Sequence, residues 1–401
     1  MTAVTFYFQI HQPYRLRQYS FFDVGRRHDY FDDLENERIL KRVADKCYRP
    51  MTLLLEELVD RHEGRFKCSF SVSGTALDQL ARWAPDVIET FRRMAKTGCV
   101  EFLCETTHHS LAALVDEKEF RDQVRCQKAR IAALTGRTPT TFRNTELVYS
   151  NQIARMAEQC GFNTIMAEGA DHLIGWRSPH HLYRPEGTES ILTMLRSYKL
   201  SDDIAFRFSN RGWDEWPMDA KKFTKWVMDL PESDDVVGLF MDFETFGEHQ
   251  WEDTGIFDFM RHLPSAILEE ERLSFALPSE IAAEVDPIAR LDAPLPVSWA
   301  DAERDLTAWL GNPMQRAAHE ALYDLGPHVR GAGDPALLET WRKLTTSDHF
   351  YYMCVKFFSD GDVHKYFSPY SSPYDAYIAL MNVMGDLRQR IDAPAGLTSP
   401  Q

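Results

Sequence analysis

Short apolar runs alternate with longer segments of helical period from residue 4 to about residue 245. The short runs are rich in β-branched and aromatic residues, which is typical of strands. We predict seven strands, at Val4–His11, Phe66–Ser73, Cys99–Cys104, Thr141–Glu146, Asn163–Glu168, Ile191–Arg196 and Val236–Asp242. Regular alternation of strands and helices indicates a parallel sheet in an α/β fold.

Apolar residues three and four apart predict helices between these strands, at Met51–Glu63, Ala76–Thr97, Glu117–Thr135 and Ser150–Cys160. A glycine stands at the end of each: Gly64, Gly98, Gly136 and Gly161. Glycine at this place favours a left-handed helix end that returns the chain to the sheet. Pro85 is expected to kink or divide the second helix.

The sheet is predicted to be a closed or nearly closed barrel. The first strand leads into His11-Gln12-Pro13 rather than into a glycine-rich loop. Neither GxGxxG nor GxxxxGK[ST] occurs in the chain, which disfavours an open nucleotide-binding sheet. Polar residues instead gather at the carboxyl ends of separate strands: His11, Glu101, Glu105, Glu146, Glu168, Asp242 and Glu244. Barrel enzymes build their sites at that end.

A second domain is expected after the barrel. The alternation stops after Pro278, and residues Asp286–Val297 are proline-rich, as in a linker. Three helices are predicted beyond it, at Pro313–Leu325, Asp334–Leu344 and Pro373–Ile391. We therefore predict a barrel domain at residues 1–285 and a helical domain at residues 286–401.

Composition excludes several function classes. The 401 residues carry 45 Lys and Arg against 61 Asp and Glu, a formal net charge of -16, which disfavours nucleic acid and anionic membrane surfaces. The apolar run Val4–Ile10 is too short for a signal peptide or a membrane span, so we expect a cytoplasmic protein. Seven cysteines without a CxxC pair indicate reduced thiols.

Two groups of carboxylates are candidates for catalysis. Glu146 ends the fourth predicted strand, and Asp242 and Glu244 stand two apart, on one side of an extended chain. Glycoside hydrolysis requires two carboxylates that flank the scissile bond. The alternative is that these acids cap helices or form ion pairs. Burial among Phe240, Phe243 and Phe246 would make a solvated role costly for Asp242.

Five short motifs in order resemble those of glycoside hydrolase family 57, retaining enzymes that act on α-glucans. They are His11-Gln12-Pro13; Gly98-Cys99-Val100-Glu101-Phe102; the segment around Glu146; Asp242-Phe243-Glu244 followed by Phe246-Gly247; and Asp305 to Asn312 around Trp309. The resemblance implies Glu146 as nucleophile and Asp242 as general acid/base, with Glu244 as a binding partner. It also implies an incomplete TIM-like (β/α)7 barrel followed by a C-terminal helical bundle that contributes to the substrate cleft.

The remaining candidate residues would bind substrate. From the motifs these are His11, Gln12, Glu101, Glu244, Asp305 and Trp309. His249, at the end of the segment that begins at Phe240, is a further candidate, and Trp213 or Trp216 is expected to stack on a sugar ring. Arg143 would hold Glu146 ionised or form a structural ion pair. Asp203, in the polar stretch Ser197–Ile204, would clamp a glucose unit, unless that stretch only caps a helix. Asp242 must have a raised pKa to act as an acid.

The predicted activity is hydrolysis of α-1,4-glucosidic bonds in α-glucans or maltooligosaccharides, without metal or cofactor. A 4-α-glucanotransferase or branching enzyme would use the same two residues. A non-catalytic glucan-binding protein is a further alternative. A metal-dependent polysaccharide deacetylase is less favoured, because none of the 14 histidines forms an HxxxH pair. Oligomeric state is not predicted.

Overall fold

The computed structural model describes residues 1–356 and 368–392. The chain forms two compact units, and each is described by itself. The first unit comprises Met1–Gln12, Arg38–Thr107 and Arg121–Trp299, and the second comprises Pro13–Glu37, His108–Phe120 and Ala300–Gln401. The predicted domain boundary after residue 285 lies inside the first unit.

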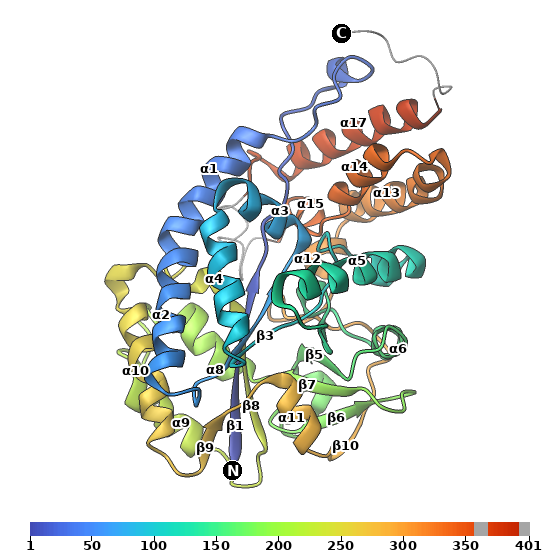
Figure 1. The fold of residues 1–401 in the computed structure, drawn as a ribbon. Helices are drawn as coiled ribbons and strands as arrows, with labels where there is room; N and C mark the ends of the chain where they lie inside the picture. Colours follow the sequence, from blue (N-terminus) through green and yellow to red (C-terminus); the bar gives the residue numbers. More distant parts are fainter. Residues whose placement is uncertain (357–367, 393–401) are drawn as a thin grey trace. The chain divides into compact units, whose positions relative to one another are not determined.

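Seven parallel strands of the first unit pair in a closed circuit. They are β1 (Thr2–Ile10), β2 (Cys68–Val72), β3 (Val100–Phe102), β4 (Thr141–Arg143), β5 (Thr164–Glu168), β7 (Leu192–Arg196) and β8 (Val236–Asp242). Strand β1 pairs with β2 and β8, β2 with β3, β4 with β5, and β7 with β5 and β8. Figure 1 shows two of the paired strands, β1 and β8, side by side. A parallel bridge between Cys104 and Phe142 joins the end of β3 to β4. All seven predicted strands are present, and the predicted parallel α/β fold is confirmed.

Three further short strands were not predicted: β6 (Leu182–Pro185), β9 (Leu273–Phe275) and β10 (Ala289–Leu291). Strand β6 is antiparallel to β7, β10 is parallel to β6, and β9 is parallel to β1. Strand β10 falls within the proline-rich stretch expected to be a linker. That stretch is therefore partly paired with the sheet.

Helices connect and cover the strands of the first unit. They are α2 (Arg49–Arg61), α3 (Gly74–Trp83), α4 (Pro85–Lys96), α6 (Asn151–Gln159), α7 (Asp171–Ile174), α8 (Tyr198–Asp202), α9 (Ala220–Met228), α10 (Ile256–Leu268) and α11 (Pro278–Glu284). Helices α1 (Asp33–Val43) and α5 (Glu117–Thr135) begin in the second unit's segments and end in the first unit's. Pro85 divides the second predicted helix and starts α4, where its missing N–H costs nothing.

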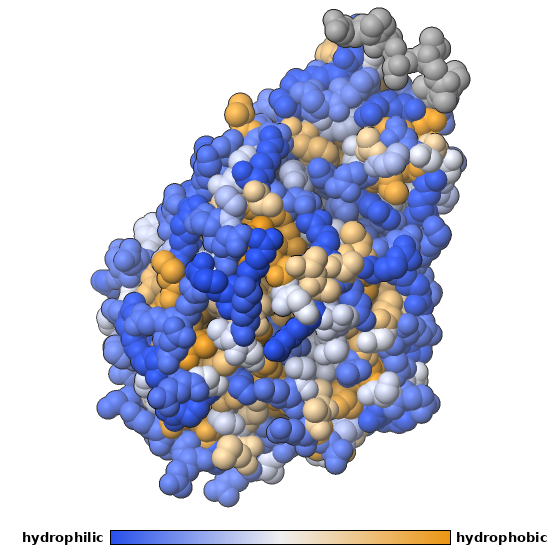
Figure 2. Space-filling model, viewed as in Figure 1, coloured by the Kyte–Doolittle hydropathy of each residue, from blue (hydrophilic) through white to orange (hydrophobic). Residues whose placement is uncertain are grey.

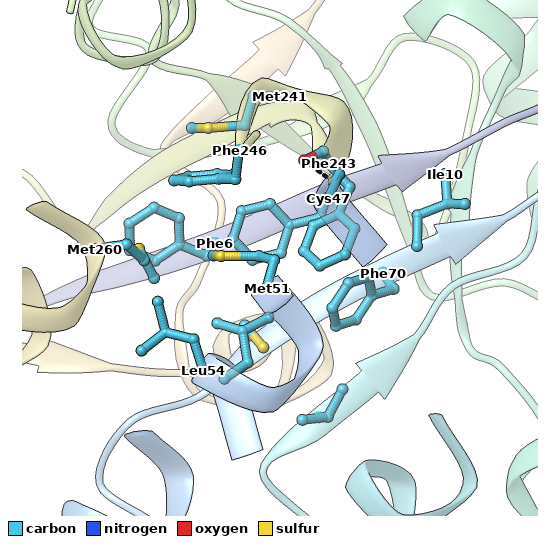
Figure 3. Close-up of a cluster of buried hydrophobic side chains, with 14 of the residues drawn as sticks. Phe6, Ile10, Cys47, Met51, Leu54, Phe70, Met241, Phe243, Phe246 and Met260 are labelled. Atoms are coloured by element: carbon cyan, nitrogen blue, oxygen red, sulfur yellow. Dashed lines mark hydrogen bonds between the residues drawn. The ribbon is translucent and has the colours of Figure 1, made fainter. Parts of the chain in front are cut away.

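Every second residue of β1 packs against the helices that cover the sheet. Phe6, Phe8 and Ile10 belong to a large buried cluster, here called the outer cluster, with side chains from α2, α4, α9 and α10. Figure 3 shows Phe6, Phe70 and Phe243 with the sulfur atoms of Met51 and Met260 around them. Burial of this many aromatic and sulfur-containing side chains is the main source of stability in this layer.

The alternate residues of the strands form a second cluster on the opposite face, here called the inner cluster. It contains Tyr7 of β1, Met166 of β5, Met194 of β7 and Phe240 of β8, with further residues that include Leu103 and Ile281 of α11. The rings of Tyr7 and Phe240 meet edge to face, with centroids 5.5 Å apart. Because strands from around the circuit contribute to one cluster, it fills the space that they enclose.

The second unit is helical in the part that the structure describes. Its helices are α12 (Thr307–Leu310), α13 (Pro313–Ala332), α14 (Pro335–Leu344), α15 (Asp348–Tyr351) and α17 (Pro373–Asp392). They include the three predicted helices. Asp386 of α17 is fully buried and accepts hydrogen bonds from the backbone N–H of Gly25 at 2.6 Å and from the hydroxyl of Tyr30. The segment before α1 is thereby tied to α17.

Hydrophilic residues cover most of the face shown in Figure 2, and apolar residues form small areas between them. Within residues 1–356 and 368–392, no helix has the length and apolar character needed to cross a membrane.

Candidate active site

The inward positions at the carboxyl ends of the strands are polar. Alternate residues of a strand lie on the same face. In β1, Gln9 and His11 therefore lie on the face of Tyr7, which belongs to the inner cluster, and in β8 Asp242 lies on the face of Phe240. The same phase in β4 and β7 leads to Arg143 and Arg196. A layer of charged and hydrogen-bonding groups therefore lies above an apolar interior.

Asp242 is the last residue of β8 and is half-buried. Strand β8 ends at Asp242, and Glu244 lies in the 3₁₀ turn Phe243–Thr245 that follows it. The prediction that an extended strand places Asp242 and Glu244 on one side is wrong in this detail. The two carboxylates still act on each other, since the charge of Asp242 raises the pKa of Glu244.

Glu244 is buried, and two side chains donate hydrogen bonds to one of its carboxylate oxygens. The hydroxyl of Tyr48 donates to its Oε1, and the side-chain amide of Gln12 donates to the same atom at 3.4 Å. Burial raises the pKa of Glu244 to about 8, and the charge of Asp242 adds to this effect, while the bonds from Tyr48 and Gln12 oppose it. Glu244 is therefore mostly protonated at neutral pH.

Glu146 lies just beyond β4, which ends at Arg143 rather than at Glu146 as predicted. It sits in the 3₁₀ turn Thr145–Leu147 with φ 56° and ψ 28°, a left-handed conformation that is uncommon for a residue with a Cβ. The side-chain amide of Asn144 closes this turn by donating to the carbonyl oxygen of Val148 at 2.9 Å. Such conformations persist where surrounding bonds hold them, and they concentrate at functional sites.

The indole of Trp299 donates from Nε1 to Oε2 of Glu146 at 2.7 Å. Trp299 is half-buried. A contact between residues so far apart in the chain has no local signal.

Arg143 is fully buried, and its guanidinium carbon lies 4.8 Å from the centroid of the Trp299 ring. None of its three guanidinium nitrogens has a hydrogen-bond partner among the described residues. Its positive charge lowers the pKa of Tyr7, whereas burial, the largest effect, and the negative charges of Glu105 and Asp242 raise it. Arg143 thus places a buried positive charge among the acids.

Three functional candidates were not selected from the sequence: Trp299, Tyr48, which holds Glu244, and Arg196. Glu105 was named among the polar residues at the strand ends without a role, and it is the inward residue two positions after Leu103. Arg196 donates to the carbonyl oxygen of Phe240 at 2.8 Å and forms ion pairs with Glu168 at 3.1 Å and Asp202 at 2.5 Å. The alternating phase of the strands would have indicated Arg196, whereas nothing local indicates Tyr48.

Two predicted binding residues are held in other bonds of the first unit. Glu101 accepts from the hydroxyl of Thr141 at 2.6 Å and from the backbone N–H of Ser279 at 2.9 Å, near the start of α11. Glu101 shares the inward phase with Leu103 and Glu105 but lies four residues before Glu105, on the other side of Leu103, where its carboxylate is held by Thr141 and Ser279. Asp203 forms an ion pair with Arg207, and burial raises its pKa.

His11 lies at the end of β1, and its Nδ1 is 2.7 Å from the hydroxyl of Ser73. His249 is half-buried, and burial lowers its pKa to about 4, so it is neutral at pH 7. Trp213 packs against Trp226, with ring centroids 5.8 Å apart. Trp216 is 42% exposed.

The last motif lies in the second unit. Trp309 is buried and its ring centroid lies 6.0 Å from that of Tyr351. Asp305 accepts from the backbone N–H of Thr307 at 2.8 Å and from the hydroxyl of the same residue at 2.5 Å, which starts α12. Within the described ranges, no three His, Cys, Asp or Glu side chains come together in a way that could hold a metal ion.

The family model of glycosyl hydrolase family 57 matches residues 5–294. This chain belongs to that family. A relative from Methanocaldococcus jannaschii, described as a "Putative alpha-amylase", is 38% identical over 405 residues, which is 97% of this chain and 84% of the relative. The predicted assignment to the glycoside hydrolases is confirmed.

Solved structures with the same fold are more distant in sequence. A family 57 branching enzyme from Pyrococcus horikoshii has a TM-score of 0.67 at 14% identity and covers 91% of this chain and 87% of its own. A 4-alpha-glucanotransferase from Thermococcus litoralis also has a TM-score of 0.67, at 18% identity over 87% of this chain, which spans only 56% of that protein's length. At these identities the likeness concerns the fold alone.

Proposed function

We propose that this protein is a retaining hydrolase of α-1,4-glucosidic bonds in α-glucans or maltooligosaccharides. The closed circuit of seven parallel strands is the (β/α)7 barrel of this enzyme, and the described helices from α12 to α17 are its C-terminal bundle. The family membership and a 38% identical relative described as an alpha-amylase support the substrate class.

The reaction proceeds in two steps, formation of a glycosyl ester and its hydrolysis. In the first, the carboxylate of Glu146 attacks the anomeric carbon while Asp242 gives its proton to the glycosidic oxygen, so the glycosidic C–O bond breaks and a glycosyl ester forms. In the second, Asp242 takes a proton from water, and the water oxygen attacks the anomeric carbon. The ester bond breaks, and Glu146 is released as a carboxylate with overall retention of configuration.

One observation carries this proposal: two carboxylates, Glu146 in the turn after β4 and Asp242 at the last position of β8, lie near the buried cation Arg143. Trp299 contacts both Glu146 and the guanidinium of Arg143. The charge of Arg143 lowers the pKa of Tyr7 and the charge of Asp242 raises it, so both groups lie near Tyr7. The indole N–H of Trp299 donates to the carboxylate of Glu146, and a bond of this kind favours the charged form that a nucleophile requires. His11, Gln12 and Glu244 lie at the same ends of the strands, and we assign them to binding sugar hydroxyls.

Incubation of the purified protein with maltoheptaose in the presence of EDTA tests the proposal. Products are separated by chromatography and reducing ends are counted, for the wild type and for Glu146→Gln. We expect net growth of reducing ends in the wild type and its loss in the variant.

The other outcomes identify the alternatives. Longer as well as shorter oligomers without new reducing ends would make the protein a 4-α-glucanotransferase with the same nucleophile. Activity that EDTA abolishes would contradict the metal-free mechanism. Binding of maltoheptaose without any change in it would indicate a non-catalytic glucan-binding protein.

A further inference from the structure

The chain after β10 runs antiparallel beside the chain that follows β4. The backbone N–H groups of Tyr149 and Val297 each donate to the carbonyl oxygen of the other at 2.9 Å. The backbone N–H of Asn151 donates to Ala293 at 2.9 Å, and the side-chain oxygen of Asn151 accepts from Ala293 at 2.8 Å. Residues 293–299 are here called the strap. These bonds fix its register against the turn that contains Glu146.

The strap ends at Trp299, which contacts Glu146 twice. Its backbone N–H donates to the carbonyl oxygen of Glu146 at 3.3 Å, and its indole Nε1 donates to Oε2 at 2.7 Å. One residue therefore holds both the left-handed backbone and the carboxylate of Glu146. The bond from the indole to the carboxylate shows that Trp299 does more than fill space beside the turn.

Two guanidinium groups lie near the indole ring of Trp299. Their carbons are 4.8 Å (Arg143) and 5.9 Å (Arg196) from its centroid. Arg196 is fixed by its bond to the carbonyl oxygen of Phe240 and by its ion pairs. Cations near an aromatic ring are attracted to its π-electrons, and in a buried site they polarise its N–H group and strengthen it as a donor.

We propose that Trp299 is a positioning residue for the nucleophile: its indole N–H orients the carboxylate of Glu146 and favours the charged form that attacks the sugar. This inference rests on the proposed function, in which Glu146 is the nucleophile. A hydrogen bond donated to the charged form of an acid lowers its pKa, so loss of the donor raises the pH at which Glu146 ionises.

Trp299→Phe removes the donor and keeps an aromatic ring. We expect kcat to fall roughly 10- to 100-fold with little change in KM, since a bond to a charged group is lost at the reacting centre. The acidic limb of kcat/KM, which reports ionisation of the free enzyme, should move to higher pH. Trp299→His, which returns a ring N–H, is expected to recover part of the loss.

Trp83→Phe is the matched control. Trp83 ends α3, is half-buried, and has the guanidinium carbon of Arg82 at the same 4.8 Å from its ring centroid. The wild-type pH profile should persist in this variant.

Two results would overturn the positioning role: a Trp299→Phe profile with an unmoved acidic limb, or an equal loss in the Phe and His variants, which would assign the effect to packing. Glu146→Gln is assayed in parallel. Full activity in that variant would instead refute the nucleophile and with it the proposed function.

Discussion

Gln9 of β1 is the register partner of Asp242 of β8 in the parallel pair that these strands form. The pairing places Asp242 at the carboxyl end of the circuit, in the same phase as the inner cluster. Its position is therefore set by the most extensively paired strand of the sheet, since β1 pairs with β2, β8 and β9. A side chain held in this way is suited to proton transfer at a fixed point.

Asp242→Asn should bind maltooligosaccharides like the wild type but turn them over about three orders of magnitude more slowly, because the amide cannot supply the proton. Hydrolysis of maltoheptaose and binding by calorimetry measure the two effects. With α-maltosyl fluoride, whose leaving group needs little protonation, the first step should be nearly normal. Added azide should then accelerate release as a glycosyl azide. An equal deficit with both substrates would contradict the acid/base role.

Glu244 links stability to pH. Its pKa is raised from 4.5 to about 8 in the folded protein, so between these values the folded state binds more protons than the unfolded chain. The free energy of unfolding should therefore fall as pH rises from about 4.5 to 8, by an amount on the order of a few kcal/mol.

Glu244→Gln removes this titrating group, and the corresponding fall should be absent from its pH profile. Urea unfolding at several pH values in this window, for both proteins, gives the difference. Parallel profiles for the wild type and the variant would show that Glu244 does not contribute in this way.

Arg143 is expected to contribute to activity without stabilising the fold. Arg143→Met keeps a long side chain and removes a buried charge whose nitrogens have no hydrogen-bond partner among the described residues. We predict an unchanged or higher Tm and at least a tenfold lower kcat/KM, since a positive charge beside the acids is lost. Calorimetry and maltoheptaose kinetics test both parts. A large fall in Tm would make Arg143 structural.

Strands β7 and β8 pair through Arg196 and Gly238, and substitution of Gly238 tests how closely the two strands approach there. A Cβ at Gly238 would lie 2.5 Å from the carbonyl oxygen of Leu195 and 2.8 Å from the ring of Phe240. Gly238→Ala should lower the free energy of unfolding by about 1–3 kcal/mol or more, because the strands must move apart.

Gly331 of α13 is the control, since no heavy atom among the described residues lies within 4 Å of an added Cβ. Gly331→Ala should be neutral or stabilise by about 0.5–1 kcal/mol. Urea unfolding compares the two variants, and equal effects would contradict the close approach at Gly238.

The elements that sequence predicted well are those whose signals are local. Gly64, Gly98, Gly136 and Gly161 all have φ between 76° and 79°, as the helix ends required. Pro85 begins a helix for a reason that concerns only its own ring and N–H. The parallel α/β fold followed from such signals, because each strand and each return is specified within a few residues.

The site was less accessible to sequence. Glu146 was assigned to the strand that begins at Thr141, yet its left-handed turn depends on a bond from Asn144 and on Trp299. Likewise the bond from Tyr48 to Glu244 joins residues 196 apart. Such contacts exist only after the circuit has closed, so pattern alone identifies the carboxylates but not the groups that hold them.

The strap also affects when the site is completed as the chain is made. Trp299 follows Glu146 by 153 residues and comes after every strand of the circuit. A nascent chain that has left the ribosome only as far as β8 holds both proposed catalytic carboxylates but not the indole that donates to Glu146. Because synthesis runs from the N-terminus, the nucleophile acquires its donor only after both carboxylates have been made, which links catalytic competence to a late-emerging segment.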